Sequence, residues 1–349
     1  MKFKLDVMRS AVTAAAAVAM LASCGGGTQI EAFVPKRVIS FGDETSLIEV
    51  DSAHPGQGRK YTVNGVKFFT DTSVSPSVNI PVVPTTPACE SNPIWVQQLA
   101  AAYGFAFSAC AASGTVTNSE MYAASGANAA DIAGQIDLFM AGNNGTFGSN
   151  DLVTVMAGMN DVIELYTLNQ PSPTANASAL IAAARQAGTE VGAQVVRIAN
   201  RGAKVIVSTI PDMGLSPFAA KEEADHPGEG RAALLSQLSA ELNTRLRVKL
   251  QDVPDGGRAV GLVLGDELVS AMYRSPLVYG FTGSVSQGAC TTTLPACDQT
   301  TTQDSYAAQT SATLTYGGAW LWADDRHLGA VAQSQLGALA LSRARSNPF

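Results

Sequence analysis

The stretch Arg37-Val38-Ile39-Ser40-Phe41-Gly42-Asp43-Glu44-Thr45-Ser46 decides the fold of this chain, because a β-prone apolar run ends abruptly in a glycine followed by acidic and hydroxyl residues. The apolar run predicts a buried strand. The residues after it predict a tight turn that presents polar side chains at the carboxyl end of that strand. Ligands of open parallel sheets bind at this end, so a functional site is expected there.

Similar Val- and Ile-rich segments recur along the chain and alternate with Ala-rich helical segments, as expected of a parallel sheet covered by helices on both faces. The length of 349 residues, with 46% hydrophobic and 15% charged, suits one large core in a single domain. The expected strands cover residues 37–41, 105–110, 152–157, 204–209 and 258–263. The expected helices cover residues 94–103, 175–200 and 327–342.

Two excursions interrupt this alternation. Residues 60–69 form two short β-prone runs around Asn64-Gly65, which predicts a hairpin near the mouth of the site. Residues 280–316 are rich in Thr and Gln and directly precede a histidine motif. Loops of this length in compact domains are often binding elements, and a passive surface excursion is the alternative.

The charge and the distribution of metal-ligating residues exclude several functions. The net charge is −7, and Lys and Arg are dispersed without a basic run, so nucleic acid is not an expected partner. Cys and His lack the spacing of a metal site. No metal and no cofactor are expected.

The N-terminus reads as an export signal, because basic residues precede the apolar run of residues 11–21, which is too short to span a bilayer. The end of this segment, Leu21-Ala22-Ser23-Cys24, resembles a bacterial lipobox, whose cysteine is lipidated. An ordinary signal with an incidental cysteine is the alternative. We expect a signal in residues 1–24, a tether in residues 25–34, one domain in residues 35–349, and a place in the bacterial cell envelope, anchored in the outer membrane or exported.

Four further cysteines suit the oxidising environment of an exported protein. Their even number permits three disulfide connectivities. The short separation favours a bridge between Cys290 and Cys297, which leaves Cys89 and Cys110 as the second pair.

Three groups elsewhere in the chain have the chemistry of an acyl-transfer site. Asp324 precedes His327 by three residues, so its carboxylate can accept from Nδ1 and leave Nε2 facing a cleft. Asn160 follows an expected strand and can donate to an oxyanion. Gly126 can offer a backbone N–H without an obstructing Cβ. His54 and His226 lie in polar Gly/Pro loops and are expected to be solvated.

In their order along the chain, these groups and the turn at residues 42–46 resemble the blocks of the GDSL (SGNH) hydrolases. The resemblance implies a flavodoxin-like α/β/α three-layer sandwich with a mainly parallel five-stranded sheet. It also implies hydrolysis of carboxylic esters, small or lipid, by Ser-His-Asp acyl transfer. The family assigns the base to His327, its orienter to Asp324 and the oxyanion donors to Gly126 and Asn160. Its serine position, however, holds Glu44.

Three interpretations of Glu44 follow. In the first, which we expect, the turn is remodelled and Ser46 is the nucleophile. In the second, Glu44 activates water with His327 or attacks directly, since carboxylates can act as bases or nucleophiles. In the third, the protein is a non-catalytic ligand-binding envelope lipoprotein. The sequence does not indicate the oligomeric state.

Overall fold

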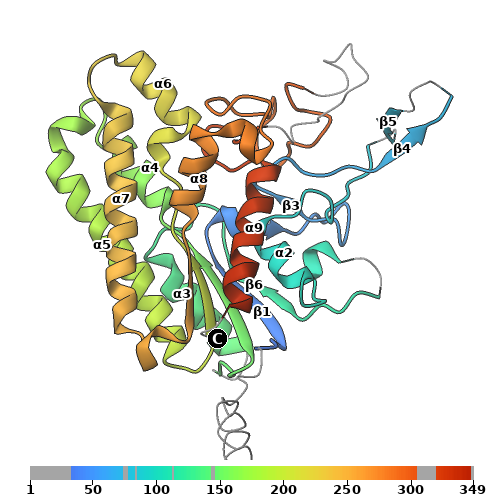
Figure 1. Cartoon of the computed structure of the whole chain (residues 1–349), viewed down its shortest axis with the longest axis horizontal. Coiled ribbons are helices and arrows are strands. Elements are labelled where there is room, and N and C mark those ends of the chain that lie inside the picture. Colours follow the sequence, from blue (N-terminus) through green and yellow to red (C-terminus); the bar gives the residue numbers. More distant parts are fainter. Residues whose placement is uncertain are drawn as a thin grey trace, which may run out of the picture. The chain divides into compact units, whose positions relative to one another are not determined.

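A five-stranded parallel sheet with the order β6-β1-β7-β8-β9 lies at the centre of the computed structural model (Figure 1). Neighbouring strands are parallel throughout this sheet. The central strands β1, β7 and β8 are almost wholly buried, which explains their continuous Val- and Ile-rich sequences. The strands are β1 (Arg37–Gly42), β6 (Ser119–Met121), β7 (Asp151–Met156), β8 (Lys204–Ser208) and β9 (Val260–Val263).

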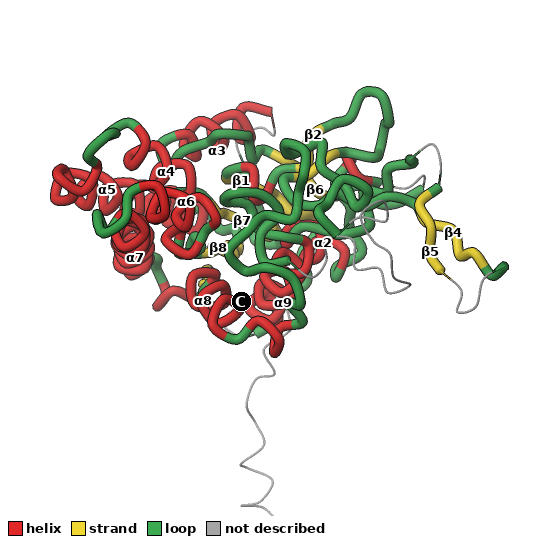
Figure 2. Tube along the Cα trace, turned by 90° about the horizontal axis from the view of Figure 1, so that it is seen from above, coloured by secondary structure: helices red, strands yellow, loops and turns green. Residues whose placement is uncertain are grey.

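Helices cover both faces of the sheet and complete the three-layer α/β/α sandwich (Figure 2). Alternate residues of β1 point to opposite faces: Ile39 packs in one hydrophobic cluster and Val38 in the other. The first cluster is covered by α3 (Asp131–Gly142), α4 (Met159–Thr167), α5 (Ala177–Ala199), α6 (Pro217–Asp225) and α7 (Arg231–Lys249). The second is covered by α2 (Trp95–Ala101), α8 (Gly265–Arg274) and α9 (Ala330–Arg345).

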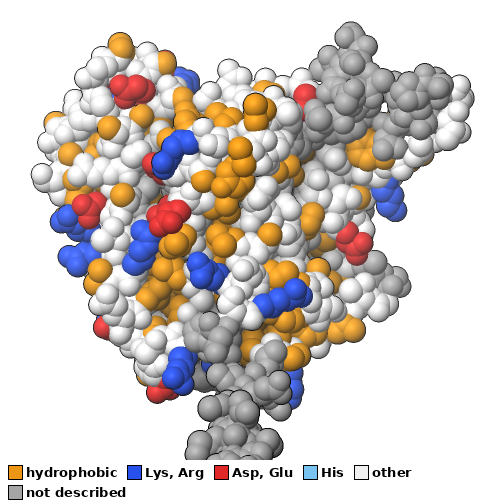
Figure 3. All heavy atoms as spheres, in the orientation of Figure 1, with side chains coloured by type: hydrophobic (Ala, Val, Ile, Leu, Met, Phe, Trp, Pro, Cys, Tyr) orange, Lys and Arg blue, Asp and Glu red, His pale blue; other side chains and the backbone are white. Residues whose placement is uncertain are grey.

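The structure describes residues 33–73, 78–82, 85–111, 114–142, 146–304 and 320–346. The expected signal, Cys24 and most of the expected tether therefore lie outside the described residues. Within these ranges no helix is both long and apolar enough to cross a membrane. On the face shown in Figure 3, Lys and Arg side chains are scattered among acidic ones and form no single basic patch.

One expected strand is wrong. Residues 105–110 do not join the sheet beyond a single bridge between Phe107 and Ser119, and they end in a 3₁₀ turn at Ser108–Cys110. Their apolar side chains instead fill the cluster around α2, and the Cys89–Cys110 disulfide ties the turn to the segment before that helix. The strand at this edge of the sheet is β6, which is short and partly polar, and β9 lies at the opposite edge.

The hairpin expected around Asn64 is also wrong. The flanking runs pair elsewhere: β3 (Arg59–Lys60) with β2 (Ile48–Glu49), and β4 (Phe68–Asp71) with β5 (Val78–Pro81). The side chain of Asn64 donates to the carbonyls of Pro295 and Cys297 at 2.9 and 3.0 Å. This asparagine therefore holds a distant loop against its own segment.

Candidate active site

The turn after β1 sets the position of Glu44. Gly42 has a φ of +142°, and a Cβ there would lie 2.1 Å from the carbonyl oxygen of Met156, so only glycine allows β1 to end this close to β7. Asp43 then caps the short 3₁₀ helix Glu44–Ser46, because its side chain accepts from the N–H of Thr45 at 2.9 Å. Glu44 thus projects from the carboxyl end of β1.

Three donors contact the carboxylate of Glu44. The residue is buried, with 5% of its surface exposed. Its Oε1 lies 3.2 Å from Nε2 of His327. Its Oε2 accepts from the backbone N–H of Gly126 and from Nδ2 of Asn160, both at 2.9 Å. The structure therefore brings together four of the residues singled out in the sequence, from the ends of β1, β6 and β7 and from the segment before α9.

Asp324 orients His327. Its Oδ2 lies 2.8 Å from Nδ1 of the ring, and its Oδ1 accepts from the backbone N–H of His327 at 2.7 Å. The N–H of Arg326 donates to the same oxygen at 2.9 Å. The carboxylate thus fixes both the turn and the ring, and Nε2 is left facing Glu44.

The ring of His327 lies between two carboxylates, which favour its protonated form. Burial alone would lower the pKa of His327, but the hydrogen bonds and charges of Asp324 and Glu44 outweigh it and raise that pKa to about 9. Burial raises the pKa of Glu44, but the hydrogen bonds from His327 and Asn160 lower it by more. The pKa of Glu44 therefore lies below its usual value. The pKa of Asp324 is lowered in the same way, mainly by His327. At neutral pH His327 is therefore a proton donor rather than a base.

Asp43 is a second buried carboxyl group beside Glu44. Burial and the charge of Glu44 raise its pKa to about 7. Its Oδ2 is buried and has no hydrogen-bond partner among the described residues. The negative charge of the turn therefore resides mainly on Glu44.

Ser46 is not brought to His327. Its side chain is fully buried, and its Oγ accepts from the indole Nε1 of Trp95 at 3.1 Å, within the cluster under α2. Residues 44 and 46 thus face different parts of the molecule, since two positions of a helical turn that are two residues apart diverge. These contacts correct the expectation that the remodelled turn would aim Ser46 at the base.

A polar group that sequence reasoning missed lies beside the histidine. The ring of Tyr61 is centred 5.5 Å from that of His327, and its hydroxyl lies 2.8 Å from both Oε1 of Glu49 and Oγ of Ser125. A cavity of about 790 Å³ that Glu49 and Ala123 help to line adjoins this group. The only sequence signal was the place of residues 60–69 near the site mouth, and it did not single out Tyr61.

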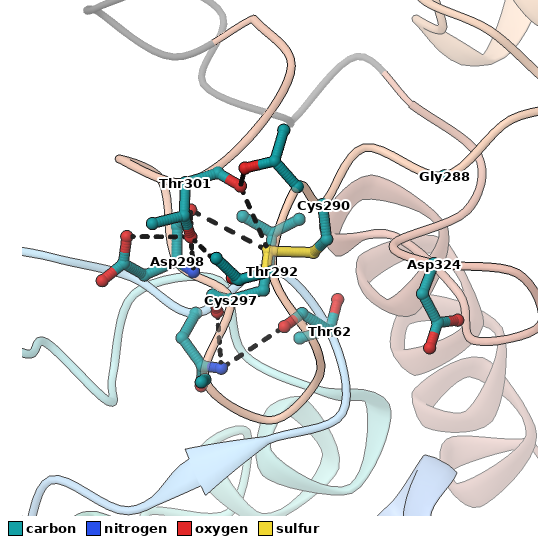
Figure 4. Close-up of a disulfide and its surroundings, with 12 residues drawn as sticks. Thr62, Gly288, Cys290, Thr292, Cys297, Asp298, Thr301 and Asp324 are labelled. Carbon is teal, nitrogen blue, oxygen red and sulfur yellow. Dashed lines mark hydrogen bonds between the residues drawn. A yellow bond between two sulfur atoms is a disulfide. The ribbon is translucent and has the colours of Figure 1, made fainter.

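The Cys290–Cys297 disulfide belongs to a loop that braces Asp324 (Figure 4). The N–H of Cys290 donates to the carbonyl of Ala323 at 2.7 Å. Gly288 lies so close that a Cβ there would be 2.6 Å from the Cα and the carbonyl oxygen of Asp324. Both disulfides join the cysteines that the sequence pairs.

No group of three metal-ligating side chains is found in the described part of the chain.

The chain is similar to one protein family and to several solved structures. Residues 85–339 match the model of a family described as GDSL-like lipase/acylhydrolase, a range that starts after Glu44. Similar solved structures include an extracellular lipase from Streptomyces rimosus, with 17% identity over 89% of this chain and 99% of that chain and a TM-score of 0.42. An acetylxylan esterase from Geobacillus stearothermophilus has 10% identity over 91% and 98%, with a TM-score of 0.44. No curated protein matches the chain.

Proposed function

The chain belongs to the GDSL-like lipase/acylhydrolase family, a family of hydrolases, and from this premise we propose that it hydrolyses carboxylic esters with the carboxylate of Glu44 as its nucleophile. Family membership supports the reaction class. One observation carries the choice of residue: the oriented histidine His327 and the two oxyanion donors Gly126 and Asn160 all contact Glu44. Small-molecule or lipid esters are the proposed substrates.

In the first half of the reaction, Oε1 of Glu44 attacks the carbonyl carbon of the ester. The bond to the alcohol oxygen breaks, and this oxygen takes the proton of Nε2 of His327, which is protonated at rest. The alcohol leaves and a mixed anhydride joins Glu44 to the acyl group. Glu44 is then neutral, so His327 loses one of the two partners that raise its pKa and becomes available as a base.

In the second half, His327 removes a proton from water as the water oxygen attacks Cδ of Glu44. Negative charge develops on Oε2, the oxygen that Gly126 and Asn160 hold. Collapse expels the substrate carboxylate and restores Glu44, which returns its extra proton to solvent. The sum is one ester and one water converted to an alcohol and an acid.

Isotope labelling tests this route. One turnover of nitrophenyl acetate in ¹⁸O-water should place solvent oxygen in the side chain of Glu44, read by peptide mass spectrometry. A serine nucleophile would leave Glu44 unlabelled. Glu44→Gln and His327→Ala should abolish turnover, while Asn200→Ala, an exposed change at the end of α5, should not alter it.

A second candidate is a non-catalytic protein that binds a ligand beside the inherited site in the envelope. The observation that favours it is that Glu44 already occupies the base and both oxyanion donors, so none is free for a substrate. This candidate requires that the natural protein give neither turnover nor label at Glu44. In either case the proposed location is the bacterial cell envelope, through a lipid on Cys24.

A further inference from the structure

The occupied oxyanion donors restrict the kind of carbon that Glu44 can attack efficiently. Attack on a carbonyl creates a negative oxygen on the substrate, which needs donors of its own. Gly126 and Asn160 are both bonded to Oε2 of Glu44 instead. Attack on a saturated carbon creates no such oxygen, because the charge passes directly to the leaving group. The first half-reaction is therefore better matched to a saturated electrophilic carbon.

The neighbouring histidine restricts the leaving group. Nε2 of His327 lies 3.2 Å from the attacking oxygen of Glu44, and Asp324 holds the opposite ring nitrogen. A halide leaves without a proton, so the ring would stay protonated and could not serve as the base of the second half. An oxygen that leaves as an alkoxide takes this proton and converts the ring into the base.

Size restricts the substrate further. Glu44 is 5% exposed and His327 8%, so little of the pair is open to a reactant. Gly126 and its neighbour Ser125 are exposed at the rim. A strained three-membered ring joins a saturated carbon to its leaving oxygen by one bond, so one small group can present the carbon to Oε1 of Glu44 and the oxygen to the neighbouring Nε2 of His327.

We propose that Glu44 opens epoxides, forming a glutamyl ester that His327 and water hydrolyse to a vicinal diol. In the first step a bond forms between Oε1 of Glu44 and a ring carbon, the carbon–oxygen bond of the ring breaks, and the freed oxygen takes the proton of His327. In the second step His327 takes a proton from water, whose oxygen attacks Cδ of Glu44. The tetrahedral intermediate expels the diol oxygen, which takes the proton back from His327. The carboxyl group of Glu44 then passes the proton that it gained to Nε2 of His327, which restores the starting pair.

This inference rests on the proposed function in one respect, the role of Glu44 as nucleophile. Purified natural protein is therefore mixed with styrene oxide in ¹⁸O-water, in parallel with the nitrophenyl ester. We expect the diol, solvent oxygen in Glu44 after one turnover, and a more than hundredfold loss of diol formation in Glu44→Gln. Asn200→Ala is the matched control on the surface.

A second variant measures the intermediate. Asn160→Ala removes a donor that acts on Oε2 in the hydrolysis step, so alkylated Glu44 should accumulate and be seen in the acid-quenched peptide, with hydrolysis slowed about 10²- to 10³-fold. Label at Glu44 from the ester with no diol from the epoxide would overturn the epoxide inference alone. Diol formation without label or adduct at Glu44 would overturn it as well. Absence of label with both substrates would overturn the proposed function too.

Discussion

Asn160 donates from Nδ2 to Oε2 of Glu44 over 2.9 Å, so the amide expected to hold a substrate oxyanion holds an oxygen of the protein itself. The backbone N–H of Gly126 makes the same contact. Any substrate must therefore either react with Glu44 or displace it. The choice between the two separates an enzyme from a binding protein at this site.

Replacing Glu44 with Ser should restore a serine nucleophile. The variant frees Gly126 and Asn160 from Glu44, and His327 loses one of the two partners that raise its pKa, so the ring that faces the new hydroxyl gives up its proton at a lower pH. We expect labelling of residue 44 by a fluorophosphonate and faster hydrolysis of short-chain nitrophenyl esters than in the natural protein. If the variant remains unreactive toward the probe, residue 44 does not occupy the nucleophile position.

Ser46→Ala should affect stability and leave turnover unchanged. It removes the acceptor of the buried Trp95 indole N–H, and a buried donor without a partner costs about 1 to 3 kcal/mol. Denaturant unfolding measures the loss of stability, and ester turnover below the unfolding transition measures activity. If the variant keeps normal stability but loses turnover, Ser46 takes part in the reaction.

Activity should follow a bell-shaped pH profile with its upper limb near the pKa of His327, about 9. Above this pH the ring cannot protonate the leaving oxygen. The lower limb reflects protonation of Glu44, whose pKa lies below 4.5. A serine-type reaction would instead gain activity as His327 loses its proton. Measurement of kcat/KM from acid to alkaline pH distinguishes the two shapes.

The same groups set a pH window for stability. The folded pKa of His327 lies above its ordinary 6.5, so its contribution is complete below pH 6.5 and is lost as the pH rises through about 9. Glu44 and Asp324 have lowered pKa values, so their contribution is present above 4.5 and 3.8 and is lost in acid. Unfolding of Glu44→Gln should show a weaker alkaline loss than unfolding of the natural protein.

Gly288→Ala should lower activity although Gly288 makes no hydrogen bond to Glu44 or His327 in the described part of the chain. The added Cβ would meet backbone atoms of Asp324 at 2.6 Å, so this segment must shift and carry the orientation of His327 with it. Displacements of about 1 Å can cost on the order of 10²-fold in rate. Gly134→Ala in α3, where nothing lies within 4 Å of the new Cβ, is the matched control. Equal activity of the two variants would remove the bracing role of the loop.

Cys24→Ala should release the protein from membranes. Acyl chains supply about 0.8 kcal/mol per buried CH₂, and the described part of the chain holds no helix suited to span a bilayer. Fractionation of cells and intact mass of the purified protein measure the outcome. A variant that stays in the membrane fraction, or a natural protein without lipid, contradicts the anchor.

Sequence reasoning predicted the elements that bury continuous apolar runs. Strands β1, β7 and β8 lie where hydrophobic patterns placed them, because burial on both faces of a sheet leaves a strong signal. Strand β9 and helices α2, α5 and α9 also lie where their apolar residues placed them. Strand β6 was not predicted, because the run Ser119-Glu120-Met121 is short and partly polar and lies at an edge of the sheet. The hairpin was wrong because Asn64 uses its amide on a segment more than two hundred residues away.

The site was predicted less completely than the fold. Order along the chain pointed to Gly126, Asn160, Asp324 and His327, since each follows a strand or forms a local motif. The direction of a side chain in a tight turn depends on the residues that pack against it. The hydroxyl of Ser46 accepts a hydrogen bond from the indole of Trp95 and therefore points away from His327. The occupation of the oxyanion donors by Glu44 is a tertiary contact that no local pattern contains.

The pairing of Glu44 with His327 closes a chain separation of 283 residues. Contacts between such distant positions form late in folding, because closing the long loop between them has a high cost in conformational entropy. In refolding, the helical signal should therefore return before any reactivity of Glu44. A chain that ends before His327 would leave Glu44 without its histidine, so the completed site requires synthesis and folding to have passed residue 327.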